Sequence, residues 1–101
     1  MIAEFSVIPI GAGESLSGLI AEVARVVDAS GLDYQITAMG TIVEGNWDEV
    51  MALIKRCHDR VRERVSRVYT KITIDDRAGA KGRLKGKVAS VEQKAGQTFK
   101  K

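Results

Sequence analysis

The chain has 101 residues, of which 45% are hydrophobic and 29% are charged, with ten glycines, one proline and one cysteine. This composition predicts a single globular domain and excludes disordered, collagen-like and disulfide-rich proteins. The formal net charge of +3 is unevenly distributed, because residues 76–101 carry eight basic and two acidic side chains, whereas residues 1–75 carry eight basic and eleven acidic ones.

The N-terminal part of the chain predicts a strand followed by a helix. Residues 2–10 alternate between apolar and polar side chains, which is the period of a half-buried strand. From residue 16 to residue 27 the apolar side chains recur every three or four positions, as on one face of a helix. Ser15 or Ser17 can cap the start of this helix, and Gly31 suits the left-handed position after its end.

A hairpin, a second helix and a fourth strand are expected next. Residues 34–39 and 41–44 read as two short strands that turn at or near Gly40. Asn46 and Glu49 have the spacing of a capping box, and the apolar residues behind them keep helical spacing as far as Val65.

The C-terminal part begins with another alternating run. Residues 67–75 predict the fourth strand, and Leu84, Val88 and Val91 suggest a short basic helix. The order strand, helix, strand, strand, helix, strand is that of an α+β, ferredoxin-like βαββαβ sandwich. We therefore expect one domain, 1–101, with its ferredoxin-like core in residues 1–77 and a basic, partly helical segment in residues 78–101.

Such a sheet carries its helices on one face only. The other face is predicted to hold apolar or mixed side chains such as Ile2, Ile8, Met39 and Tyr69. An exposed apolar face is unusual in a monomer, so we expect a second copy of the chain to cover it. Self-association as a dimer or tetramer is thus the first functional expectation.

Few residues suit catalysis or metal binding. Cys57 and His58 are neighbours on one helix and therefore point about 100° apart, and no third group orients them. The Gly11-Ala12-Gly13 run lacks the further glycine of a dinucleotide fingerprint, and Asp75-Asp76 reads best as a solvated strand end. We expect no catalytic residue, no metal site and no enzyme activity.

The basic C-terminal segment could in principle follow a phosphate backbone. A sheet that reads single-stranded RNA presents two or three stacking aromatic rings, and strand 41–44 has none. We therefore expect a solvated or subunit-contacting segment and no nucleic-acid partner.

Several features predict a cytoplasmic protein without a membrane partner. No apolar run approaches the roughly 20 residues of a membrane-spanning helix. The N-terminus lacks a signal-peptide pattern, and the single cysteine, Cys57, cannot form an intramolecular disulfide.

The segment from Tyr34 to Trp47 combines aromatic rings, a thioether, hydroxyls, glycines and the carboxylate of Glu44. Rings stack on a flat heterocycle, backbone groups hydrogen-bond its polar edges, and a carboxylate offsets positive charge. The alternative is that Tyr34 and Trp47 are ordinary core residues, and spacing alone leaves both interpretations open.

Four motifs in the chain carry a family resemblance. They are Gly31-Leu32-Asp33-Tyr34-Gln35, Met39-Gly40-Thr41 with Glu44-Gly45, Ile74-Asp75-Asp76-Arg77, and Lys87-Val88-Ala89-Ser90-Val91-Glu92. With them the chain resembles the YkoF-like thiamine-binding family of small proteins over nearly its whole length.

The resemblance implies a ferredoxin-like fold, assembly into dimers and usually tetramers, and binding of thiamine or its hydroxymethylpyrimidine part without turnover, with no cofactor besides that ligand. Met39, Gly40, Thr41 and Glu44 match the family motifs and would lie at or beside the pocket. From the residues alone we add Ser15, Tyr34 and Trp47 as candidate ligand contacts. The main alternative is an ACT-like regulatory or structural oligomer without a thiamine ligand.

Overall fold

The computed structural model describes residues 1–11, 16–79 and 81–100. Its elements, in chain order, are β1 (Ile2–Ile10), α1 (Leu16–Ala29), β2 (Asp33–Thr37), β3 (Gly40–Glu44), α2 (Trp47–Arg62), β4 (Arg67–Asp75) and α3 (Arg83–Ala95). The sheet order is β2-β3-β1-β4, with every neighbouring pair antiparallel. The predicted ferredoxin-like fold, with an additional C-terminal helix, is confirmed.

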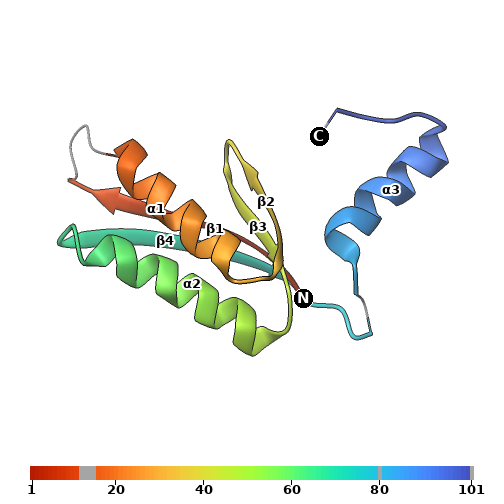
Figure 1. The fold of residues 1–101 in the computed structure, drawn as a ribbon. Helices are drawn as coiled ribbons and strands as arrows, with labels where there is room; N and C mark the ends of the chain where they lie inside the picture. The colour runs from red at the N-terminus through yellow and green to blue at the C-terminus, as the bar shows by residue number, and fades with distance from the viewer. Residues whose placement is uncertain (12–15, 80, 101) are drawn as a thin grey trace.

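Helices α1 and α2 lie side by side over one face of the sheet (Figure 1). The core lies between these two helices and the sheet. Its side chains come from every second position of the strands and from one stripe of each helix. Its buried members are Ala3, Phe5, Val27, Val43, Val50, Leu53, Ile54 and Cys57. None of the described helices has the length and apolar character needed to cross a membrane.

The predicted capping box at the start of α2 is confirmed. The Asn46 side chain accepts a hydrogen bond from the Glu49 N–H, and the Glu49 carboxylate accepts one from the Asn46 N–H, both at 2.9 Å. The helix ends at Arg62, before the predicted limit at Val65. The Val65 N–H nevertheless still donates to the Val61 carbonyl, so the helical spacing outlasts the regular helix by one turn.

The hairpin turns one or two residues before Gly40. β2 ends at Thr37 and β3 begins at Gly40, which pair with each other, so the turn is formed by Ala38 and Met39. Met39 therefore lies at the hairpin tip, 83% exposed, and not on the open face of the sheet as expected. Ser17 is the second residue of α1, and Ser15 lies outside the described residues.

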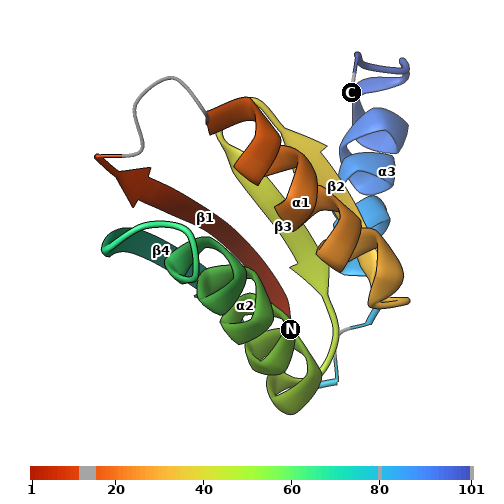
Figure 2. The ribbon, with the colours of Figure 1, turned by 60° about the vertical axis from the view of Figure 1, so that its left-hand side comes forward.

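The face of the sheet opposite α1 and α2 is only partly covered. Ile8 and Tyr69 are direct cross-strand partners on that face and are 41% and 53% exposed. α3 lies on the far side of the β2–β3 hairpin from α1 (Figure 2). Ile8 and Tyr69 remain exposed.

Candidate ligand groove

A groove of about 350 Å³ lies between α1, β1 and the β2–β3 hairpin, and we call it the hairpin groove. Its size falls in the usual range of small-molecule sites, roughly 300–1,000 Å³. Two of the predicted ligand residues on β3, Gly40 and Thr41, line it together with Met39 of the turn. The apolar remainder of the lining comes mainly from Phe5, Val7, Pro9, Leu19, Ile20, Val23, Ala24 and Ile36.

The turn beside this groove is held by the hydroxyl of Thr37. Its Oγ1 donates to the Gly40 carbonyl at 2.8 Å and accepts from the N–H groups of Met39 and Gly40, each at 3.2 Å. On β1, the Ser6 hydroxyl donates to the Met39 carbonyl at 3.1 Å. Thr37 and Ser6 were not among the predicted site residues. Thr37 could have been predicted from the sequence, because it lies three residues before Gly40. That spacing is typical of a hydroxyl that hydrogen-bonds a local turn.

Gly40 allows the hairpin to lie directly against β1. A Cβ at this position would be 2.9 Å from both the Phe5 carbonyl oxygen and the Ser6 Oγ, closer than real side chains come. The carbonyl belongs to a paired strand and cannot move aside. The glycine of the Met39-Gly40-Thr41 motif is therefore required by a close approach of backbone.

The lining of the hairpin groove suits an uncharged planar ring. Among the described residues, its side chains are hydrocarbons, a thioether, a proline ring, a phenyl ring and the hydroxyls of Ser6, Thr37 and Thr41. Two of these hydroxyls already hold the turn, whereas that of Thr41 has no hydrogen-bond partner in the described part of the chain. Thr41 can therefore offer a donor or an acceptor to a ligand.

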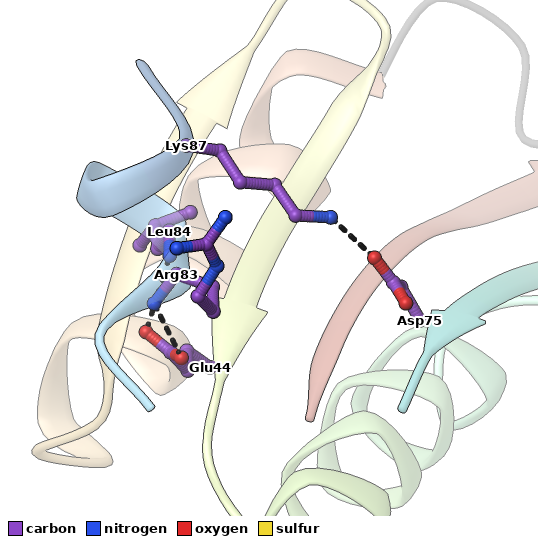
Figure 3. A network of polar contacts seen from close by, with 5 residues as sticks. All are labelled: Glu44, Asp75, Arg83, Leu84 and Lys87. Atoms are coloured by element: carbon purple, nitrogen blue, oxygen red, sulfur yellow. Dashed lines mark hydrogen bonds and ion pairs between the residues drawn. The ribbon is translucent and has the colours of Figure 1, made fainter. Parts of the chain in front are cut away.

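Glu44 lies at the other end of β3 and has a different partner. Its Oε2 accepts a hydrogen bond from the Arg83 N–H at 2.9 Å, and its Oε1 accepts one from the Leu84 N–H at 3.3 Å (Figure 3). The N-cap residue of α3 is Gly82, which has no side chain to accept these bonds. Glu44 thus takes the place of an N-cap side chain and fixes α3 to the sheet.

The two predicted aromatic contacts lie away from the hairpin groove. The Tyr34 hydroxyl donates to Asp28 Oδ1 at 2.7 Å, linking β2 to the end of α1, and this bond raises the pKa of Tyr34. Trp47 begins α2 and is 55% exposed. The structure therefore brings Met39, Gly40 and Thr41 together and separates them from the other candidates that it describes.

The side chains of Cys57 and His58 make contacts within the fold and lie outside the hairpin groove. Cys57 belongs to the buried core, and its burial raises the pKa of the thiol to about 11. The His58 Nδ1 lies 2.6 Å from the Thr70 Oγ1 of β4. Residues 1–11, 16–79 and 81–100 contain no cluster of three or more metal-ligating side chains. Of the Gly11-Ala12-Gly13 run, only Gly11 belongs to the described residues.

The model of one protein family matches residues 3–92, and its description is thiamine-binding protein. The chain belongs to the thiamine-binding protein family. One relative of the chain is a UPF0045 protein of Mycobacterium bovis, 42% identical over 94 residues that cover 92% of each chain. A UPF0045 protein of Methanothermobacter thermautotrophicus is 40% identical over 95 residues, covering 91% of this chain and 96% of its own.

Solved structures show the same fold for this thiamine-binding family member. A hypothetical protein from Methanocaldococcus jannaschii superposes with a TM-score of 0.82 at 32% identity, covering 91% of this chain and 95% of its own. A Thermotoga maritima protein, named as a candidate thiamine biosynthesis/salvage protein, gives a TM-score of 0.78 at 22% identity, covering 89% and 96%. At that identity the second likeness concerns the fold alone.

Proposed function

We propose that this protein binds thiamine or its hydroxymethylpyrimidine part, without turnover, as a homo-oligomer. The observation that carries the proposal is the hairpin groove, which is built around the Met39-Gly40-Thr41 motif in a chain of the thiamine-binding family. A groove with an apolar lining and few hydroxyls binds planar rings by burial and orients them by one or two hydrogen bonds.

The two rings of thiamine make different demands on a site. The aminopyrimidine is neutral and has donor and acceptor edges, which suits the apolar walls and the Thr41 hydroxyl. The thiazolium is a cation, and the described lining of the groove offers it no carboxylate, because Glu44 is bound to the start of α3. We therefore place the pyrimidine inside the groove and the thiazolium at its mouth, near Met39.

Binding without turnover agrees with the chemistry of the lining. Hydrocarbon, thioether and hydroxyl side chains provide contact and hydrogen bonds but no group that titrates near neutral pH. Self-association is supported by the exposed Ile8 and Tyr69 on the uncovered sheet face.

Calorimetric titration with hydroxymethylpyrimidine and with thiamine tests the proposal. Ala24→Leu adds bulk to the groove wall and is expected to weaken binding by about tenfold or more, since several ligand contacts are lost. Ala52→Leu makes the same change on the exposed side of α2 and should leave affinity at the wild-type value.

Two results would contradict this proposal. One is the absence of heat with either compound at millimolar concentration, and the other is an equal affinity of the two leucine variants. An intact oligomer that binds neither compound would favour the ACT-like alternative, in which subunits only contact one another.

A further inference from the structure

A second recess lies around the connection between β4 and α3. It has two adjoining parts, of about 120 Å³ and about 300 Å³, which share Arg77 and Arg83. Lys87 lines the first part and Lys81 the second. We call this volume, with the four basic residues Arg77, Lys81, Arg83 and Lys87 that line it, the basic recess.

The carboxylates at this recess are already engaged. Glu44 accepts the N–H groups of Arg83 and Leu84, and Asp75 forms an ion pair with Lys87 (Figure 3). Arg77, Lys81 and Arg83 form no ion pair with any residue in the described part of the chain, Asp76 included. The recess therefore has four cationic side chains against the two carboxylates of Glu44 and Asp75, so its net charge is positive.

Two contacts made by carboxylate side chains also hold part of the recess in place. Glu44 fixes the start of α3 at Arg83, and the pair of Asp75 with Lys87 joins the end of β4 to the next turn of the same helix. Arg77 and Arg83 lie close enough to Asp75 for their charges to contribute, after the dominant Lys87 contact, to its lowered pKa. An anion entering the recess would thus meet cations that the fold has already gathered.

We propose that the basic recess binds the phosphate or diphosphate group of a small phosphorylated molecule. Guanidinium groups match phosphate oxygens with two parallel hydrogen bonds, and a multiply charged anion relieves the mutual repulsion of Arg77, Lys81 and Arg83. Glu44 already accepts the first N–H groups of α3, so these groups are not free for the phosphate. The side chains of Arg77, Lys81 and Arg83 therefore bind it.

This recess is separate from the hairpin groove. The groove contacts β1 at residues 5–9, whereas the recess contacts Met1 and Ile2. These positions are roughly 10–25 Å apart along a strand. The inference does not depend on the function proposed for the groove.

Calorimetry with inorganic pyrophosphate at low ionic strength tests the site, with two variants of equal net charge. Arg77→Gln/Arg83→Gln removes two guanidinium groups of the recess and keeps the N–H that Glu44 binds. Arg56→Gln/Arg60→Gln removes two exposed guanidinium groups from α2. We expect the first variant to bind pyrophosphate about tenfold or more weakly than the second, the factor for losing one charge-assisted hydrogen bond.

Lys81 is exposed, so Lys81→Gln should not destabilise the fold. This variant should weaken pyrophosphate binding by about threefold. Hydroxymethylpyrimidine serves as the control ligand, because its affinity for Arg77→Gln/Arg83→Gln should equal that of the wild type. That comparison separates a failure at the recess from a failure at the groove.

Three outcomes would overturn the inference. The wild-type protein could give no heat with millimolar pyrophosphate, or the two double variants could lose affinity equally, which would indicate attraction by net charge only. A single-stranded oligonucleotide could also bind more tightly than pyrophosphate with a steep salt dependence, which would assign the recess to a nucleic-acid backbone.

Discussion

Glu44 and Arg83 are 39 residues apart in the chain, yet the Glu44 carboxylate accepts the Arg83 N–H at 2.9 Å and so joins β3 to α3. A second bond, from the Leu84 N–H, uses the other oxygen of the same carboxylate. Family resemblance predicts Glu44 as a pocket residue, and this contact gives it a structural role within the subunit. The two roles can be separated by experiment.

Glu44→Ala should release the first turn of α3. We expect a loss of about 1 kcal/mol in the free energy of unfolding, as for loss of an N-cap, and faster hydrogen exchange at Leu84. Glu44→Gln keeps one amide oxygen and should recover part of the loss. Glu4→Ala, on an exposed side chain of β1, is the control. A weaker affinity for hydroxymethylpyrimidine with unchanged exchange in α3 would instead support a ligand role.

Gly40→Ala is expected to destabilise the protein by about 1–3 kcal/mol, because its Cβ meets the Phe5 carbonyl oxygen at 2.9 Å. Chemical denaturation measures the change. Gly18→Ala is the matched control, since Gly18 lies in α1 and a Cβ added there would have nothing within 4 Å, and it should stabilise by about 0.5–1 kcal/mol. Equal effects of the two alanines would show that the hairpin does not approach β1 this closely.

The open sheet face should carry the proposed self-association. Ile8→Lys/Tyr69→Lys places charges on two cross-strand partners and is expected to shift the protein toward monomer in analytical ultracentrifugation. Ala52→Lys introduces a charge on the exposed side of α2 and should leave the mass unchanged. An oligomer that survives the double substitution would place the interface elsewhere.

The Cys57 thiol should remain unreactive in the folded protein. Its pKa is raised by burial from 9.0 to about 11, so the folded state favours the neutral thiol. The resulting stability is complete below about pH 9 and is lost as the pH rises toward 11. A thiol reagent at pH 8 should modify Cys57 at the rate of global unfolding, and Cys57→Ala should remove this part of the pH dependence. Rapid labelling without denaturant would contradict a buried position.

Local patterns in the sequence determined most of the secondary structure. Alternation predicts β1 and β4 with the bounds that the structure gives, and the Asn46–Glu49 spacing predicts the start of α2. These features depend on side chains that are neighbours in the chain, so a single sequence contains them. The hairpin turn was displaced by one or two residues because the Thr37 hydroxyl, three residues before Gly40, sets where it closes.

The composition of the candidate site was decided by the tertiary structure. Met39, Gly40 and Thr41 meet α1 in one groove, whereas Glu44, only three residues after Thr41, lies at the far end of the strand and binds α3. Proximity in sequence did not become proximity in space, because an extended strand advances about 3.3 Å per residue and alternates its side chains between two faces. The partner of each polar group depends on which distant segment the fold brings to it, and that information is absent from local spacing.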